Sequence, residues 1–381
     1  MMKKVLVGIS GGVDSAVAAY LLKKEGYNVT GAFMRNWDST ANNDISGNPT
    51  LNNNICPQEQ DYNDALNVCE HLGIELLRID FIKEYWDNVF TYFIEEYKLG
   101  RTPNPDILCN KYIKFDYFLD YAEKNNFDYI AMGHYAGVEH TSSGSFMIKA
   151  KDTNKDQTYF LSQLSQYQLS KSLFPLQNYT KPEIRNIAKE INIPVANKKD
   201  STGICFIGER DFKQFLSNYI PAKPGDIIDY VTHKKIGTHA GVMYYTIGQS
   251  KGLGIGGQKG FDNGKWYVMG KNLDKRILYV SNDSEQKFLK SNKALVNNIV
   301  INNQKFEGIK NCNAKFRYRQ KEQNAQVEWI DETSAYITYS DQEPLGVTVG
   351  QAAVLYLDEY CIGGGEISKV FLNDIELQYE R

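Results

Sequence analysis

Short apolar runs alternate with longer amphipathic stretches through the first half of the chain. Strands, rich in β-branched and aromatic residues, are predicted at residues 5–9, 27–34, 74–79 and 128–132. Helices, with helix-forming residues or apolar positions at helical spacing, are predicted at residues 14–24, 59–72, 83–98, 111–125 and 182–191. Strands that alternate with helices indicate an α/β fold with a doubly wound parallel sheet.

The alternation is interrupted between Arg35 and Gln58, where the chain is rich in asparagine and has no periodicity. A loop of this length is uncommon unless it is functional or disordered. We predict a long mobile loop here, either a lid beside a ligand or a disordered insertion.

Helical periodicity fades from about residue 221, and short β-like runs then alternate with glycine-containing turns. We therefore predict three domains: a catalytic domain at residues 1–209, a small mixed domain at 210–285, and a compact β-barrel at 286–381. A length of 381 residues fits this number of domains. There is no internal repeat and no heptad pattern, so a monomer is the default expectation.

Composition narrows the class of protein. A hydrophobic content of 42% and a charged content of 23% are typical of soluble globular proteins. No apolar run approaches the ~20 residues that span a bilayer, and no signal peptide precedes the first strand, so we expect a cytoplasmic protein. A net charge of −3 excludes a globally basic nucleic-acid binder. The six cysteines form no C-x-x-C pair, and no metal site is predicted.

A glycine-rich turn joins the first strand to the first helix. Residues 10–15 read Ser-Gly-Gly-Val-Asp-Ser, and their backbone N–H groups together with the start of the helix make an anion site. The turn fits neither G-x-x-x-x-G-K-[ST] nor G-x-G-x-x-G. It matches the pyrophosphate loop of enzymes that split ATP between the α- and β-phosphates; a ligand-free turn is the alternative. Met34 ends the predicted strand 27–34 and Gly133 follows the predicted strand 128–132, so both lie at the edge where such sheets bind ligands.

Two cysteines stand in distinctive surroundings. Asp106 and Cys109 follow a proline-stiffened loop at residues 101–105, close to a helix start whose field favours thiolate. Cys205 follows a Ser-Thr-Gly turn. Taken alone, each cysteine fits an inert buried thiol better than a reactive one, and Asp106 fits a helix cap better than an acid or base.

A basic stripe occurs near the C-terminus. Lys315, Arg317, Arg319 and Lys321 alternate with other residues, so on a strand all four would share one face. A solvated charged face is the alternative, but a phosphate backbone would neutralise these charges, and we predict RNA contact here.

Together these stretches resemble the bacterial tRNA-specific 2-thiouridylases over nearly the whole chain. The resemblance is carried by residues 8–15, 101–110, 132–135, 154–161, 200–210, 246–257 and 317–320. It implies that ATP, with Mg²⁺, adenylates the C2 oxygen of the wobble uridine in tRNAs for lysine, glutamate and glutamine, and that sulfur replaces this oxygen. Arg35 and Met132 depart from the residues that the family more often has.

The resemblance also implies roles for the reactive residues. Cys205 would carry a persulfide delivered by a partner such as a cysteine desulfurase or a sulfur-relay protein. Cys109 would be the partner thiol and Asp106 a proton shuttle. Two versions stay open: Cys109 attacks the persulfide, releasing sulfide and leaving a Cys109–Cys205 disulfide, or the persulfide attacks the uracil directly.

Further site residues follow from the same resemblance. The ATP site would comprise Gly8, Ile9, Ser10, Gly11, Gly12, Val13, Asp14, Ser15, Met34 and Gly133. The target base would meet Asn104, Pro105 and Asp106, and the rest of the tRNA would meet His134, Lys155, Asp156, Gln157, Arg317, Tyr318 and Gln351. For His134 a structural histidine, and for Gln351 a surface polar residue, are the alternatives.

Two other classes of function use the same loop. An ATP enzyme with an amine nucleophile would not need the paired cysteines, and a non-catalytic nucleotide or RNA-binding module would release no AMP. Activity of a Cys205→Ser variant would favour the first.

Overall fold

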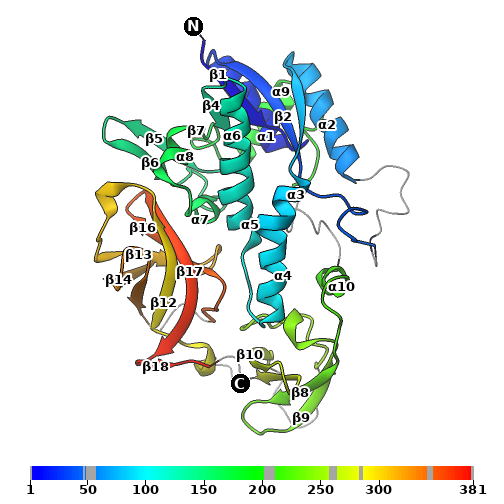
Figure 1. The fold of residues 1–381 in the computed structure, drawn as a ribbon, viewed down its shortest axis with the longest axis vertical. Coiled ribbons are helices and arrows are strands. Elements are labelled where there is room, and N and C mark those ends of the chain that lie inside the picture. The colour runs from blue at the N-terminus through cyan, green and yellow to red at the C-terminus, as the bar shows by residue number, and fades with distance from the viewer. Residues whose placement is uncertain are drawn as a thin grey trace.

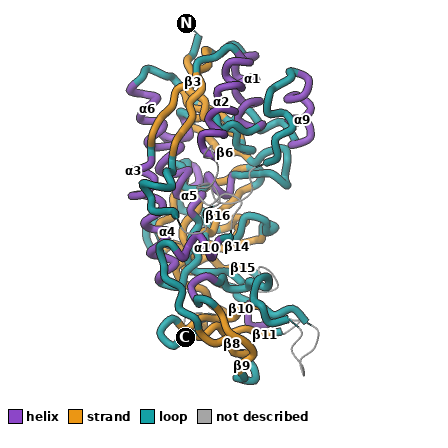
Figure 2. Tube along the Cα trace, turned by 90° about the vertical axis from the view of Figure 1, so that its right-hand side faces the viewer, coloured by secondary structure: helices purple, strands orange, loops and turns teal. Residues whose placement is uncertain are grey.

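The computed structural model describes residues 2–45, 48, 57–200, 211–256, 264–282, 286–340 and 346–378. The molecule is elongated, with a parallel-sheet domain at the N-terminal end and a β-barrel beside the middle of the long axis (Figure 1). Figure 2 shows the strands of the small middle domain at the end of the molecule opposite the N-terminus.

The N-terminal sheet has five parallel strands in the order β3-β2-β1-β4-β7. They are β1 (Lys4–Gly8), β2 (Asn28–Arg35), β3 (Leu76–Asp80), β4 (Tyr129–Ala131) and β7 (Ser172–Leu173). The strand order reverses between β1 and β4, which confirms the predicted doubly wound sheet. This reversal is the point at which open α/β sheets bind ligands.

After Lys4, strand β1 is buried because its alternate side chains enter two different cores. Val5 and Val7 pack with α1 (Val13–Lys24), α2 (Pro57–Leu72) and α9 (Lys181–Glu190). Leu6 packs into the other core, with a second layer of helices. A β-branched run without polar positions is what such a two-sided strand requires.

The second helical layer consists of two long helical runs. The first comprises α3 (Ile82–Tyr85), a π-helical stretch Trp86–Phe90 and α4 (Thr91–Lys98). The second comprises α5 (Pro105–Leu108), a π-helical stretch Cys109–Tyr117 and α6 (Phe118–Lys124). The second run begins six residues before the predicted start, because Pro105 occupies the first helical turn, where its missing N–H costs nothing.

The predicted mobile loop after β2 is wrong over the part that is described. Residues 36–45 form compact turns, and Trp37, only 4% exposed, stacks on Trp86 and packs against Phe90 and Phe215. The Trp37 indole also donates to Asp44, 3.1 Å away. Residues 46, 47 and 49–56 lie outside the described residues.

The middle domain is a mixed four-stranded sheet in the order β10-β11-β8-β9. Its strands are β8 (Gly225–Asp229), β9 (Lys235–His239), β10 (Tyr267–Asn272) and β11 (Ile277–Ser281), preceded by α10 (Phe212–Ser217). Only the β8–β11 pair is parallel.

Six antiparallel strands close into the predicted C-terminal barrel. They are β12 (Lys293–Ile301), β13 (Asn311–Lys315), β14 (Gln323–Trp329), β15 (Ala335–Tyr339), β16 (Ala352–Leu357) and β17 (Tyr360–Leu372), and β12 pairs with β17 to close the ring. The short β18 (Ile375–Glu376) pairs with β17.

An unpredicted hairpin joins the barrel to the N-terminal domain. It consists of β5 (Gly137–Thr141) and β6 (Gly144–Ile148), and β6 pairs with the start of β17. The short helices α7 (Thr158–Leu161) and α8 (Gln166–Ser170) follow the hairpin. No described helix combines the length and apolar character that crossing a membrane requires.

Candidate functional site

The Ser-Gly-Gly turn ends β1 and opens α1 with unpaired amide groups. Gly11 has a φ of +72°, and Gly12 is the N-cap residue. Within the described ranges, no side chain caps this helix. The Ser15 hydroxyl instead accepts from the Ser10 amide at 3.1 Å and donates to the Gly12 carbonyl, which holds the turn in shape. The first amides of α1 therefore remain available to an anion.

Close packing explains why glycine occupies several of the predicted ATP-site positions. A Cβ at Gly133 would lie 2.7 Å from the Ser15 amide nitrogen, and a Cβ at Gly8 would lie 2.6 Å from the Met132 sulfur and 3.1 Å from the Met34 methyl group. The predicted ATP-site residues from three separate stretches of the chain thus meet at the carboxyl ends of β1, β2 and β4.

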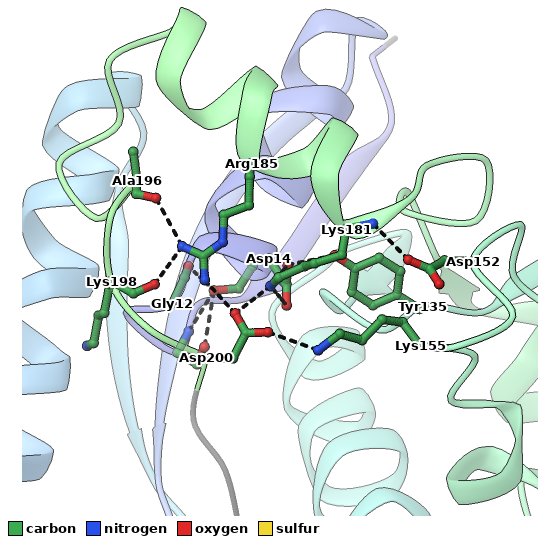
Figure 3. A network of polar contacts seen from close by, with 12 residues as sticks. Gly12, Asp14, Tyr135, Asp152, Lys155, Lys181, Arg185, Ala196, Lys198 and Asp200 are labelled. Carbon is green, nitrogen blue, oxygen red and sulfur yellow. Dashed lines mark hydrogen bonds and ion pairs between the residues drawn. The ribbon is translucent and has the colours of Figure 1, made fainter. Parts of the chain in front are cut away.

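A network of ion pairs lies at the mouth of this turn (Figure 3). The Lys181 ammonium contacts the Asp14 carboxylate at 2.7 Å and the Asp200 carboxylate at 2.7 Å. Asp200 also pairs with Arg185 at 2.6 Å and with Lys155 at 2.9 Å. Asp200 is partly buried, which disfavours its charge, but its hydrogen bonds to Lys181 and Lys155 outweigh burial and hold its pKa well below the usual value.

No lysine follows the glycines of the turn in the sequence, but the fold brings Lys181 there, a residue that was not predicted to belong to the site. Lys181 is the first residue of α9. A lysine is unfavourable at a helix N-terminus, because the helix dipole is positive there. That mismatch was the one local signal for Lys181. Tyr135, whose hydroxyl donates to Asp14 at 2.9 Å, gave no such signal.

The segment that leads to Cys205 is fastened beside the same turn. Arg185 donates to the backbone carbonyls of Ala196 and Lys198, and Lys198 pairs with Asp61 and Asp64 near the start of α2. Residues 201–210, with Cys205 among them, lie outside the described residues.

The proline-stiffened loop before Asp106 lies where all three domains meet. The Lys271 ammonium of the middle domain donates to the Gly100 carbonyl at 2.6 Å, and Lys271 is 1% exposed. The Gln351 side-chain amide of the barrel donates to the Thr102 carbonyl at 2.6 Å. The Thr102 amide donates to the Val349 carbonyl at 3.3 Å. Residues far apart in sequence therefore set the path of this loop.

Asp106 and Cys109 occupy the first turns of the helical run that follows the loop. Cys109 is 1% exposed. Burial raises the pKa of Asp106, and the charge of Lys114 opposes this rise. Among the described residues, none donates a hydrogen bond to the Asp106 carboxylate. A carboxyl group with a raised pKa and free oxygens is suited to hold or pass a proton.

Most of the residues predicted to meet tRNA also make contacts inside the protein. Asn104 is the N-cap residue of α5. The Gln157 side chain accepts from the Tyr135 amide at 2.9 Å, and Asp156 is buried and accepts from the Ala150 amide and the Thr158 hydroxyl. These contacts neither exclude nor support a contact with tRNA, so the assignments stay predictions.

His134, one of the predicted tRNA contacts, is half-buried and packs among aromatic rings. Its ring lies 5.9 Å from Phe115 and 6.4 Å from Phe174 between centroids, and among the described residues its buried Nδ1 has no hydrogen-bond partner. Burial, with the charge of Lys114, lowers its pKa well below the usual value, so the ring is neutral at physiological pH.

The predicted basic strand face is wrong. Strand β13 ends at Lys315, and the following residues form the turn to β14, so the four cations do not share a strand face. Lys315 approaches Glu322, and the Arg317 guanidinium donates to the carbonyls of Ile247 and Gly346. Only Arg319 and Lys321 are exposed. An alternation of charged and uncharged residues does not distinguish a strand from a turn whose arginine points inward. Tyr318 of the same turn packs on Phe160.

Three family models match the chain in succession. They are the tRNA methyl transferase HUP domain at residues 3–209, the tRNA methyl transferase PRC-barrel domain at residues 213–282 and the aminomethyltransferase beta-barrel domain at residues 291–367. The tRNA-specific 2-thiouridylase MnmA of Mycoplasma capricolum is 57% identical over 379 residues, covering 97% of this chain and 100% of the relative. Its counterpart in Mesoplasma florum is 56% identical over 382 residues, with the same coverage.

The chain belongs to the tRNA-specific 2-thiouridylase family. This membership confirms the resemblance seen in the sequence motifs. Among solved structures, a complex of a 4-thiouridine synthetase with RNA and bound ATP aligns with 58% of this chain and 46% of that chain at 14% identity. The TM-score of that alignment is 0.32, which is too low to support a statement about this chain.

Proposed function

We propose that this chain is an ATP-dependent sulfurtransferase that replaces the C2 oxygen of the wobble uridine of tRNAs for lysine, glutamate and glutamine with sulfur. The observation that carries the proposal is the uncapped start of α1 behind a Ser-Gly-Gly turn, in a chain that is 57% identical over almost its whole length to a tRNA-specific 2-thiouridylase.

The residues around the turn fit the phosphates of ATP. The amides of α1 would bind phosphate oxygens, the glycines at positions 11, 12 and 133 allow close approach, and Lys181 supplies a cation at 2.7 Å from Asp14. Mg²⁺ would accompany ATP as its counter-ion, and we assign no described residue as its ligand. These residues would hold ATP while the uridine O2 attacks the α-phosphorus and pyrophosphate leaves.

The loop at residues 101–105 would present the target base. Asn104 and Pro105 precede Asp106, whose raised pKa suits it to move a proton at the base as the C2 oxygen becomes a leaving group. Domain contacts from Lys271 and Gln351 fix the path of this loop, so we infer that binding of tRNA across the domains and presentation of the base are linked.

Sulfur would come from a persulfide on Cys205, loaded by a partner such as a cysteine desulfurase or a sulfur-relay protein. The terminal sulfur forms the new bond to C2, and AMP departs with the oxygen. In one version the Cys109 thiolate attacks the persulfide first, which releases the sulfide that attacks C2 and leaves a Cys109–Cys205 disulfide. In the other the persulfide attacks C2 directly, and the Cys109 thiolate then attacks the Cys205 sulfur of the adduct, which frees the sulfur on C2 and leaves the same disulfide. Both versions remain part of the proposal.

The test is mass spectrometry of nucleosides from unmodified tRNA incubated with the protein, ATP, Mg²⁺ and a persulfide source. We expect 2-thiouridine at the wobble position only when ATP is present. Cys109→Ser and Cys205→Ser should each abolish the product while tRNA binding stays, with Cys312→Ser, a buried thiol of the barrel, as the matched control.

Other outcomes point elsewhere. AMP release without a thionucleoside would favour an ATP enzyme with another acceptor, as would activity of Cys205→Ser. Absence of both products, with folded protein and an active sulfur source, would favour a binding module and overturn the proposal.

A further inference from the structure

One carboxylate connects the ATP turn to a residue of the predicted tRNA surface. Asp200 contacts Lys181, Arg185 and Lys155 at 2.6–2.9 Å, and no other described acidic residue pairs with three cations. Lys181 in turn contacts Asp14, the second residue of α1 (Figure 3). Asp200 is therefore the shared partner of a lysine at the nucleotide side and a lysine at the RNA side.

The two lysines differ in their surroundings. The Lys181 side chain is 14% exposed and is enclosed by Asp14, Asp200 and the Tyr135 ring. The Lys155 side chain is 43% exposed, and its backbone carbonyl accepts from Tyr318, in the turn that also holds the exposed Arg319. An anion at the start of α1 would therefore meet Lys181 first, whereas a phosphate arriving from solution would meet Lys155.

The charges in this network favour competition for the lysines. Three cations face two carboxylates, so each lysine already has a carboxylate partner when no phosphate is bound, and the network keeps one net positive charge. A phosphate group that binds Lys181 or Lys155 must replace Asp200 as its partner or share it. Interactions between partly exposed charges at this separation are strong enough to alter affinity severalfold and are weakened by salt.

We propose that Asp200 is a positioning residue that holds Lys181 and Lys155 in place and competes with the phosphates of ATP and tRNA for them. This inference rests on the proposed function, because it takes ATP and tRNA as the ligands. It goes further in assigning Asp200, Lys181 and Arg185, none of which belongs to the predicted ATP or tRNA sites.

The first test is Asp200→Asn, with binding of ATP and Mg²⁺ measured by calorimetry in the absence of tRNA. Because a competitor for Lys181 is lost, we expect the Kd for ATP to fall about threefold or more at low salt, and the difference from the wild type to shrink at high salt. Turnover in the thiolation assay should fall, since Lys181 and Lys155 are no longer oriented. Asp200→Glu should restore both values toward the wild type.

The matched control is Asp152→Asn. The Asp152 carboxylate accepts from the backbone amide of Lys181 at 2.9 Å and pairs with no described ammonium group, so its loss removes one nearby negative charge without freeing a lysine. We expect little change in ATP affinity. A merely structural role of Asp200 would weaken ATP binding, and unchanged or weaker binding by a folded Asp200→Asn variant would overturn the proposal.

A second variant keeps the proposal testable if Asp200→Asn does not fold. Lys155→Met leaves Asp200 with fewer partners, so Asp200 should hold Lys181 more firmly and the Kd for ATP should rise, opposite to the effect of Asp200→Asn. Lys151→Met is its control, because the Lys151 ammonium pairs with Glu183 instead. An equal rise in both variants would overturn the coupling.

Since ATP binding is measured without turnover, a wild-type protein that fails to thiolate tRNA would overturn the proposed function and not this inference.

Discussion

The two halves of the candidate site are held together in different ways. Around the ATP turn, the side chains that make contact all belong to the N-terminal domain, and they meet as ion pairs between Asp14, Lys181 and Asp200. The loop before Asp106 is held instead by donors from the other two domains, Lys271 and Gln351, each bound to a backbone carbonyl.

The contacts around the ATP turn come from one domain alone, whereas the contacts that hold the loop before Asp106 need all three domains. The half proposed to bind phosphate depends on the packing of one doubly wound sheet. The half proposed to present the base depends on the docking of the middle domain and the barrel against residues 100–104. Substitutions in the two halves should therefore separate ATP binding from thiolation, and the predictions below test that separation.

Gly133→Ala should have the largest effect on thiolation, because it changes the half of the site that is proposed to bind phosphate. The added Cβ would lie 2.7 Å from the Ser15 amide nitrogen and 2.9 Å from the Asp14 carbonyl carbon, so the start of α1 must shift. A misplacement of this kind can cost about 100-fold in rate. We expect a loss of that order in thiolation and weaker ATP binding, with tRNA binding retained.

Gly256→Ala is the control for this variant, because a Cβ at Gly256 would meet no atom of the described residues within 4 Å. ATP affinity can be followed by calorimetry and tRNA affinity by filter binding. Normal ATP binding by Gly133→Ala would show that the turn tolerates the shift, and the proposed phosphate site would then be in the wrong place.

Lys271→Met should affect the other half of the site, the loop before Asp106. It removes the ammonium group that donates to the Gly100 carbonyl at 2.6 Å, and a buried acceptor without its donor costs about 1–3 kcal/mol. We expect thiolation to fall about tenfold, which corresponds to about 1.4 kcal/mol in the barrier, while the Kd for ATP stays unchanged.

Lys275→Met, an exposed lysine in the turn between β10 and β11, should change neither value. Thermal unfolding of both variants distinguishes a displaced loop from general loss of structure. If ATP binding falls together with thiolation in a folded Lys271→Met protein, the two halves are not separable in the way that their contacts indicate.

The features that sequence could predict are those encoded over a few neighbouring residues. The apolar run at Val5–Ile9, the glycines of the turn and the start of α1 follow each other directly, and the structure has them within one or two residues of the prediction. The doubly wound sheet follows from the alternation of such elements. Family membership followed from motifs of the same kind.

What sequence could not predict depends on contacts between distant residues. Lys271 and Gly100 are separated by 171 positions, and Lys181 and Asp14 by 167. Neither pair leaves a periodic pattern in the sequence. The pairing of β6 with β17 was missed for the same reason. The basic stripe shows the converse error, in which a local period of two was taken for a strand although the chain turns at Phe316.

Reversing the exposed half of that stripe should have a moderate effect on tRNA binding. Neither Arg319 nor Lys321 forms an ion pair with a described residue, whereas Arg317 donates to backbone carbonyls inside the protein. Arg319→Glu with Lys321→Glu should weaken tRNA binding and flatten the slope of log K against log salt by between about 1 and 2. Filter binding over a range of salt concentrations measures this slope.

Lys305→Glu with Lys310→Glu is the matched control, since it changes the net charge equally at exposed lysines elsewhere on the barrel. Equal slopes for the two double variants would mean that only total charge matters. The prediction of RNA contact at the turn would then be wrong, and the base-presenting half would reach tRNA through other residues.

The smallest expected effect concerns the pH dependence of stability at His134. Burial and the charge of Lys114 lower its pKa well below the usual value, so the folded protein holds the ring neutral, whereas the unfolded chain binds a proton below about pH 6.5. The unfolded state therefore gains protons as pH falls, and the free energy of unfolding should drop by up to about 1.4 kcal/mol per pH unit below that point. His134→Gln should lose this component, while His140→Gln, at an exposed position of β5, should keep it. Thermal unfolding at pH 7, 6 and 5 gives the comparison.

An equal loss of stability in all three proteins would mean that His134 becomes protonated without penalty. Its position near Phe115 and Phe174 would then not exclude a charged role toward tRNA.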